Sequence, residues 1–139
     1  MKKALFILVV LATLLLSACG SGSGSDNSVP QEIGTLESVP AEYAGKTNPL
    51  GADASAEGAK IFKTNCETCH GSKGYGDGPV GEALDPKPQN LAELQAVASD
   101  DYLLWRIAEG KPGTSMPPWK NILTEEQIWQ IVAFIRTLK

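Results

Sequence analysis

The sequence is poor in the side chains that bind metals or form cross-links. Among its 139 residues it has 1 histidine, 3 cysteines and 2 methionines. A small secreted chain that was held together by disulfides would carry a larger, even set of cysteines, so a disulfide framework is excluded. Any metal or cofactor chemistry must therefore depend on a very small number of identifiable residues.

Aromatic residues, strand patterns and positive charge are scarce as well. Phe, Trp and Tyr occur 3 times each, so few large side chains are available for an apolar core. The stability of a domain this small is marginal unless a cross-link, metal or cofactor adds to it. No alternation of apolar and polar residues follows residue 53, so we expect no sheet there. The 16 acidic residues outnumber the 12 basic ones, which makes nucleic acid a poor candidate partner.

The N-terminus has the pattern of a lipoprotein signal peptide. Two lysines precede an apolar run over residues 4–16, which is too short for a permanent membrane span. The junction at residues 16–19, Leu-Ser-Ala-Cys, resembles the bacterial signal in which the cysteine is acylated and becomes the first mature residue. We expect residues 1–18 to be removed and Cys19 to carry the lipid anchor. The alternative is an ordinary signal peptide that leaves Cys19 as a free thiol.

A segment rich in Gly, Ser and Pro separates the signal from the rest of the chain. Residues 20–28 alternate Gly and Ser and then add Asp and Asn, and three prolines follow before residue 50. We expect residues 19–52 to be the lipidated cysteine and a flexible tether, and residues 53–139 to form one domain. In the alternative, the second half of this segment docks on a partner through its apolar residues, which are Ile33, Leu36, Val39 and Tyr43.

The domain is predicted to be all-α. Residues 54–65 form a first helix behind a capping Asp or Ser, and a short helix is expected over residues 102–109, ended by a glycine. Residues 71–88 are rich in Gly and Pro and are expected to form an ordered loop. The last helix opens with a Thr124/Gln127 capping box and continues with apolar residues at helical spacing: Ile128, Ile131, Val132, Ile135 and Leu138.

Residues 66–70, Cys-Glu-Thr-Cys-His, form the pattern by which haem is attached covalently to a protein. Cysteines three residues apart on one helical turn point the same way, and each can form a thioether with a vinyl group of the haem. His70 is then placed as an axial ligand of the iron. A redox dithiol would need a thioredoxin-like βαβ context, and a zinc site would need a fourth ligand that no remaining Cys or His supplies. We expect one haem c, attached to Cys66 and Cys69.

The second axial ligand must be of another residue type, because His70 is the only histidine. After removal of the signal peptide Met116 is the only methionine, and it lies in the Gly- and Pro-rich stretch 113–119. A solitary methionine is often core filler, but the proline that follows Met116 favours an extended backbone that can present its sulfur. We expect His70 and Met116 to fill both axial positions. No position then stays open for oxygen or peroxide, so we expect an electron carrier and not an enzyme.

Residues 53–139 resemble a class I monohaem cytochrome c. Beyond the haem motif, Gly58 and Phe62 stand where that family packs its N-terminal helix against its C-terminal helix. Ile131 and Phe134 match the facing positions of the last helix. The resemblance implies the all-α class I fold, in which helices pack around one covalent haem c.

The same resemblance implies roles for residues around the haem. The carbonyl of Pro79 is expected to accept a hydrogen bond from the ring of His70, which would fix the ring and strengthen it as a ligand. Trp105 and Arg106 are expected near the propionate edge, where either could donate a hydrogen bond. The alternative is that the tryptophans fill core space beside the porphyrin.

The expected function is one-electron transfer by a lipid-anchored shuttle on the extracytoplasmic face of a cell membrane, periplasmic or outer. Its partners would be redox proteins, such as a quinol-oxidising complex or a terminal oxidase, with a basic docking patch that complements an acidic chain. The lipoprotein signal, residues 76–79 and residues 116–119 also resemble the monohaem lipoprotein subunit of alternative complex III, which would make the chain a fixed subunit. A third alternative is a five-coordinate haem enzyme or ligand sensor.

Overall fold

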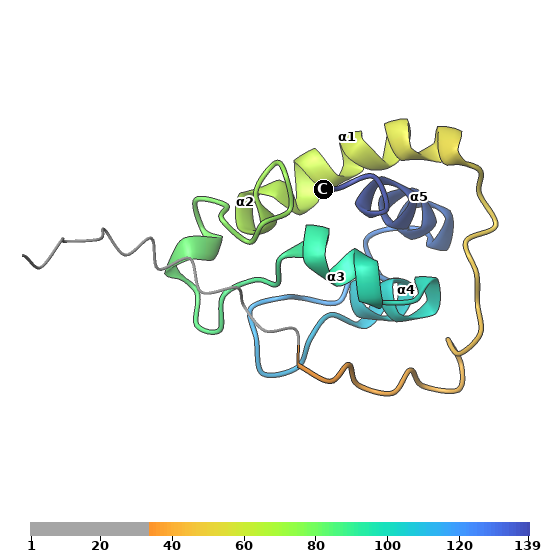
Figure 1. The fold of residues 1–139 in the computed structure, drawn as a ribbon, viewed down its shortest axis with the longest axis horizontal. Helices are drawn as coiled ribbons and strands as arrows, with labels where there is room; N and C mark the ends of the chain where they lie inside the picture. Colours follow the sequence, from red (N-terminus) through yellow and green to blue (C-terminus); the bar gives the residue numbers. More distant parts are fainter. Residues whose placement is uncertain (1–33) are drawn as a thin grey trace, which may run out of the picture. The chain divides into compact units, whose positions relative to one another are not determined.

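The computed structural model describes residues 34–139, and within this range its regular elements are all helical. The expected all-α class is therefore confirmed, and Figure 1 shows α1 lying across α5, with α3 and α4 below α5.

None of the helices in the described range is long and apolar enough to cross a membrane. The predicted signal peptide and Cys19 lie outside the described residues. The elements are a 3-10 turn Ala52–Ala54, α1 Ser55–Asn65, α2 Glu67–His70, a 3-10 turn Gly81–Ala83, α3 Leu91–Val97, α4 Asp100–Glu109 and α5 Glu125–Ile135.

The helices predicted from apolar spacing and caps match α1, α4 and α5. The capping box at the start of α5 is present, because Thr124 Oγ1 accepts from the N–H of Gln127 at 3.2 Å. In return, the N–H of Thr124 donates to Gln127 Oε1 at 2.9 Å. Helix α4 begins at Asp100, two residues before the predicted start, with Ser99 as its N-cap. The starts of these helices were thus predicted to within two residues. The predicted Asp or Ser cap of α1 is wrong, because Ala54 precedes the helix without a side-chain cap, and α5 ends at Ile135, before the predicted Leu138.

Helix α3 was not expected from the sequence. Asn90 caps it, since its Oδ1 accepts from the N–H groups of Ala92 at 3.0 Å and Glu93 at 3.3 Å. The buried Leu91 and Leu94 anchor the helix to the core. A helix this short is marginal in isolation, so packing rather than local propensity maintains it.

The contact between α1 and α5 is the most extensive between any two elements of the described part. It depends on Gly58, because a Cβ at this position would lie 1.9 Å from the carbonyl oxygen of Gln130 in α5. Phe62, one turn later, is 2% exposed and packs on Phe134 with ring centroids 5.0 Å apart. The backbones of the two helices therefore approach more closely than any side chain at residue 58 would allow.

We expect Gly58→Ala to lower the free energy of unfolding by about 2–3 kcal/mol, since overpacking of this kind outweighs the roughly 1 kcal/mol that alanine gains in a helix. Urea denaturation followed by circular dichroism measures the change. Gly51→Ala is the matched control, because Gly51 has no atom within 4 Å of its Cβ position and no left-handed φ. A Gly58→Ala protein as stable as wild type would show that the helices tolerate a wider separation.

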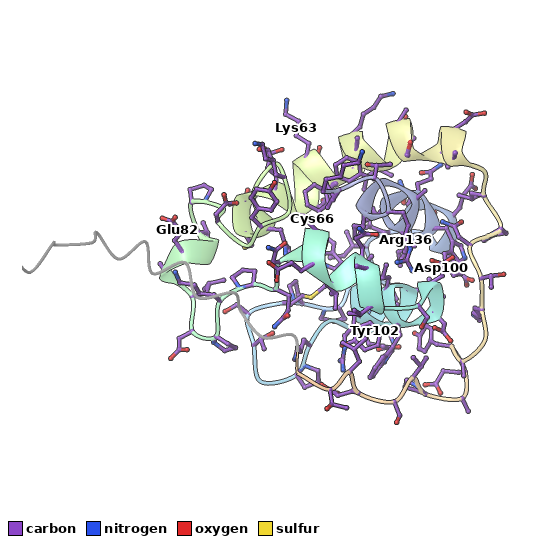
Figure 2. The ribbon with its side chains drawn as sticks, in the orientation of Figure 1. Lys63, Cys66, Glu82, Asp100, Tyr102 and Arg136 are labelled. Carbon is purple, nitrogen blue, oxygen red and sulfur yellow. The ribbon has the colours of Figure 1, made fainter. Side chains whose placement is uncertain are left out.

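Arg136 joins three helices at one point. Its Nη2 donates to Asp100 Oδ1 of α4 at 2.7 Å and to the carbonyl of Ala98 at 2.8 Å, and its Nη1 contacts the carbonyl of Gln95. Figure 2 shows the side chains of Arg136 and Asp100 next to each other. The guanidinium therefore satisfies carbonyls at the C-terminal end of α3 as well as pairing with the first residue of α4.

Residues 34–51, which we call the strap, pack on the domain instead of forming part of a flexible tether. Leu36, Val39, Tyr43 and Leu50 of the strap pack against the core, and Figure 1 shows the strap, in orange, running along α4 before it reaches α1. The predicted tether boundary at residue 52 is therefore wrong for the described residues. Of the apolar side chains that could have docked on a partner, Leu36, Val39 and Tyr43 pack within the chain itself, and Ile33 lies outside the described residues.

Polar contacts fasten the strap at its centre. The hydroxyl of Tyr43 donates to Glu109 Oε1 at 2.5 Å, and the N–H of Gly45 donates to Asp101 Oδ2 at 2.7 Å. The side-chain amide of Asn48 donates to the carbonyl of Trp129 in α5 at 2.9 Å. The strap thus bridges α4 and α5 through groups that local sequence patterns do not pair.

Strap attachment is expected to weaken in acid. The pKa of Asp101 is lowered by hydrogen bonds from Ser99 and then Gly45, and the pKa of Glu109 by hydrogen bonds from Lys120 and then Tyr43. The two ionised carboxylates stabilise the fold fully when the pH is above their ordinary pKa values, which are 3.8 for Asp101 and 4.5 for Glu109. This stabilisation is lost as the pH falls from those values through the lowered pKa values of the folded protein.

Hydrogen exchange at pH 6 and pH 3 tests this expectation. At pH 3 the protection factor of the Gly45 amide should fall, because a detached Asp101, with its ordinary pKa of 3.8, takes up a proton and so favours detachment. The amide of the fully buried Val132 in α5 serves as the control. Unchanged relative protection of the two amides would mean that apolar packing alone holds the strap.

Candidate haem-binding site

The Cys-Glu-Thr-Cys-His motif folds as a single helical turn directly after α1. The N–H of Cys66 donates to the carbonyl of Phe62 at 2.8 Å, which ends α1. The N–H of His70 then donates to the carbonyl of Cys66 at 2.9 Å, and that of Gly71 to the carbonyl of Glu67 at 2.8 Å. Because the turn is closed by these bonds, Cys66 and Cys69 project into the same cavity as His70.

The glycine-rich loop after the motif closes back onto this turn. The N–H of Val80 donates to the carbonyl of Thr68 at 3.0 Å, and the N–H of Gly78 donates to that of Cys69 at 3.2 Å. A Cβ at Gly81 would lie 2.0 Å from the carbonyl oxygen of Cys69. The predicted ordered loop is present, with a 3-10 turn inside it, and its glycines let it lie directly on the backbone of α2.

The ring of His70 contacts a different carbonyl from the one that we predicted. Its Nδ1 lies 3.4 Å from the carbonyl oxygen of Gln89, whereas Pro79 is exposed and does not line the cavity. The neighbours of Pro79 are bonded to the backbone of α2, and the start of α3 brings Gln89 to the ring instead. The expected role of Pro79 is therefore corrected to Gln89.

Burial sets the protonation state of His70. The removal of the ring from water lowers its pKa, and the backbone contact with Gln89 opposes this effect only in part. Phe62 packs beside it, with ring centroids 6.5 Å apart. The imidazole is therefore neutral at pH 7, which is the form that ligates a metal ion.

The two cysteines are not arranged as a reactive dithiol. They are unpaired, and burial raises the pKa of Cys66 to about 12, with a smaller contribution from the nearby Cys69. A dithiol that exchanges disulfides needs a lowered thiol pKa, so that the thiolate is available to react. The environment of Cys66 thus argues against redox-dithiol chemistry.

Met116 lies in a loop that is bonded to the end of α4. The N–H of Lys111 donates to the carbonyl of Met116 at 3.2 Å, and the N–H of Met116 donates to Thr114 Oγ1 at 3.2 Å. After Met116 the chain comes back to α4, where the N–H of Trp119 donates to the carbonyl of Ala108 at 3.0 Å. The loop is thereby held in place on both sides of Met116, which lines the cavity.

A cavity of about 260 Å³ brings Cys66, Cys69, His70 and Met116 together. A single water needs roughly 10–15 Å³ of such space, and close-packed protein interiors contain few voids larger than one water. A space this large inside so small a domain is therefore the site of a bound group rather than a packing defect. Most of its wall is apolar, formed by Leu84, Leu91, Leu94, Leu103, Ile107, Trp119, Ile131 and Ile135.

The residues around the cavity fit a covalently attached haem. Two thiols can form thioethers, a neutral imidazole and a thioether sulfur can ligate iron, and apolar walls can cover a porphyrin. Arg106, which we expected near the propionates, also lines the cavity and is 7% exposed. Trp105 does not line it and stacks instead on Arg106, with the guanidinium carbon 3.7 Å from its ring centroid.

Some residues that line the cavity were not predicted from the sequence. These are residues 34–37 of the strap and, before α3, residue 84 and residues 86–89. The only available signal was Asn90, a good N-cap residue followed by leucines three residues apart, which could have located α3 and with it Gln89. The apolar residues of the strap indicated that it could dock, but they did not show that it docks on its own domain.

Comparisons with known proteins agree with this geometry. Residues 53–135 match the family described as Cytochrome C oxidase, cbb3-type, subunit III. The chain is 34% identical over 86 residues to cytochrome c6 of Thermosynechococcus vestitus, a match that covers 62% of this chain and 70% of that protein. It is 32% identical over 117 residues to the Cbb3-type cytochrome c oxidase subunit FixP of Bradyrhizobium sp. (strain ORS 278). That match covers 83% of this chain but only 38% of FixP.

Solved structures show the same fold. The KustC0563 c-type cytochrome is 34% identical with a TM-score of 0.52, and the match covers 59% of this chain and 96% of that one. A chain of the Kuenenia stuttgartiensis reducing HAO-like protein complex Kustc0457/Kustc0458 has a TM-score of 0.57 at 24% identity, over 66% of this chain and 47% of that one. The chain therefore belongs to the class I monohaem cytochromes c, which carry one covalent haem c and transfer electrons.

Proposed function

We propose that this cytochrome is anchored through a lipid on Cys19 and relays single electrons between redox proteins on the extracytoplasmic face of a membrane. The support for electron relay is that the predicted thioether and axial residues line one cavity. The support for the anchor is the signal-like sequence at residues 1–19, which lies outside the described residues. One lipid chain holds a protein only marginally, so stable anchoring would require the multiple chains of a lipoprotein.

In this proposal Cys66 and Cys69 attach the haem, and His70 and Met116 ligate its iron. The haem supplies the one-electron couple, and the chain supplies its environment. Gln89 orients His70, the loop bonds around Met116 fix the position of its sulfur, and the apolar wall keeps water from the iron. A thioether ligand raises the potential relative to nitrogen ligation, as an electron acceptor from a quinol-oxidising enzyme requires.

The packed strap restricts how far an anchored domain could travel. If only residues 20–33 separate the lipid from the strap, the link cannot exceed about 50 Å at full extension. A link through residue 52, as first expected from the sequence, would have reached roughly 110 Å. The shorter link suits partners that lie beside the anchor in the same membrane.

A fixed place in a larger complex is the second candidate function. The relatives named as oxidase subunit FixP are much longer proteins, and the family that matches residues 53–135 is also named for an oxidase subunit. The resemblance to the monohaem lipoprotein of alternative complex III favours a quinol-oxidising assembly instead. The short link to the membrane is compatible with either assembly.

Native gel electrophoresis of membranes solubilised in mild detergent, stained for haem, tests both proposals. The lipid-anchored relay is supported if the wild-type protein is in the membrane fraction and migrates alone, while Cys19→Ser is released in soluble form. Comigration with a large assembly would replace the shuttle by the fixed subunit. A Cys19→Ser protein that remained membrane-bound without other subunits would overturn the lipid anchor.

A further inference from the structure

Arg106 is a buried cation whose guanidinium is only partly satisfied. Its side chain is 8% exposed and lies against the rings of Trp105 and Tyr102, at 3.7 Å and 5.5 Å from their centroids. Its Nε donates to the hydroxyl of Tyr102 at 3.4 Å, and its Nη2 is paired with a carboxylate of the strap. A guanidinium has five N–H donors, so the N–H groups of Nη1 are left without a protein acceptor in the described part of the chain.

Glu37 of the strap supplies the only carboxylate that pairs with Arg106 in the described part of the chain. Its Oε2 lies 2.5 Å from Nη2 of Arg106, an ion pair by distance that does not have the geometry of a hydrogen bond. Its Oε1 lies 3.9 Å from Nζ of Lys111. Glu37, Arg106 and Lys111 all line the haem cavity, so the strap brings one negative charge to two positive ones at its wall.

We infer that the pair of Glu37 and Arg106 sets the reduction potential of the haem and closes the strap over that side of the cavity. Arg106 is placed to donate its free N–H groups to an anionic group of the haem, while Glu37 partly neutralises its charge from the strap. Both residues act as positioning residues, since neither is a proposed ligand of the iron. This inference rests on the proposed haem site.

The sign of the effect follows from simple electrostatics. The oxidised iron carries one more positive charge than the reduced iron, so a nearby cation favours reduction and a nearby anion opposes it. A low-dielectric surrounding strengthens the effect of the buried Arg106, whereas solvent weakens that of Glu37, whose side chain is 58% exposed. Removal of the charge of Glu37 leaves the charge of Arg106 uncompensated and should raise the reduction potential.

The strap is a feature that the family match does not include. That match begins at residue 53, after the end of the strap. Glu37 therefore lies outside the residues that match the family, and through it an N-terminal segment reaches the haem environment. A segment fastened by charge can tune the potential without any change in the residues that hold the haem.

The test compares Glu37→Gln with Glu42→Gln in haem-loaded, full-length protein. Glu42 is the matched control, because it is an exposed glutamate of the same strap that does not line the cavity. Spectroelectrochemical titration should show the equilibrium constant for reduction raised about tenfold in Glu37→Gln, which corresponds to about 59 mV for one electron, and unchanged in Glu42→Gln. Hydrogen exchange should show faster exchange of the amides of residues 35–39 in Glu37→Gln alone.

The two readouts separate the possible failures. A Glu37→Gln protein with a normal haem spectrum and the wild-type potential would overturn this inference and leave the proposed function intact. Equal shifts in the two variants would also overturn it, because they would reflect net charge and not the pair. A wild-type protein that carried no haem would overturn the proposed function itself.

Discussion

Replacement of both Cys66 and Cys69 by alanine is expected to abolish haem attachment and stable folding of the domain together. Without the thioethers the cavity of about 260 Å³ is left without its covalent occupant. Its largely apolar wall would then face water, and the domain would lose the burial that the haem supplies. A domain this small has only about 5–15 kcal/mol of stability to lose. Haem staining of a denaturing gel and circular dichroism measure the two losses.

Thr68→Ala provides the control for this double variant. Thr68 is exposed and lies between the two cysteines on the same turn, so its loss leaves both thiols in place. This protein should keep its colour and its cooperative unfolding transition. A haem-free Cys66→Ala/Cys69→Ala protein with native helix content would contradict the structural role that we assign to the haem.

Replacement of Met116 by alanine is expected to open the sixth coordination position of the iron. The weak long-wavelength band of the oxidised protein, which comes from sulfur ligation, should disappear, and the reduced protein should bind carbon monoxide. The reduction potential should fall by on the order of 0.1–0.2 V, a fraction of the roughly 0.8 V range that axial ligation spans. Optical spectra and redox titration measure these changes.

Met116→His distinguishes loss of a ligand from damage to the loop. Histidine can ligate iron from the same position, so this variant should resist carbon monoxide while it still lacks the sulfur band. If wild-type protein binds carbon monoxide as readily as Met116→Ala, then Met116 is not a ligand. The five-coordinate enzyme or sensor would then become the better account.

The residues of the haem site were predictable where the chemistry is local. The attachment motif lies within five consecutive residues, and helix α5 carries both apolar spacing and a capping box. Gly58 and Ile131 could be matched to a family pattern, and the structure shows why a glycine is required there. Met116 was selected because it is the only methionine outside the predicted signal peptide, and the structure places it at the same cavity.

The remainder depended on contacts between distant parts of the chain. The carbonyl at the ring of His70 belongs to Gln89 and not to Pro79, because the position of α3 decides which backbone segment reaches the ring. The strap was predicted to be tether because its composition is that of a linker, and its contacts are with residues more than 50 positions away. Pairings of this kind leave no period or motif in the local sequence.

The sequence alone determined the helical class, the attachment of one haem and the candidate ligands, because each of these follows from short-range spacing or from the count of a rare residue. Only the tertiary structure decided that residues 34–51 pack on the domain, which carbonyl contacts His70, and that Glu37 meets Arg106 at the cavity wall. The physical reason is that apolar burial and charge pairing depend on distances in space, which residues remote in sequence acquire only when the chain has folded.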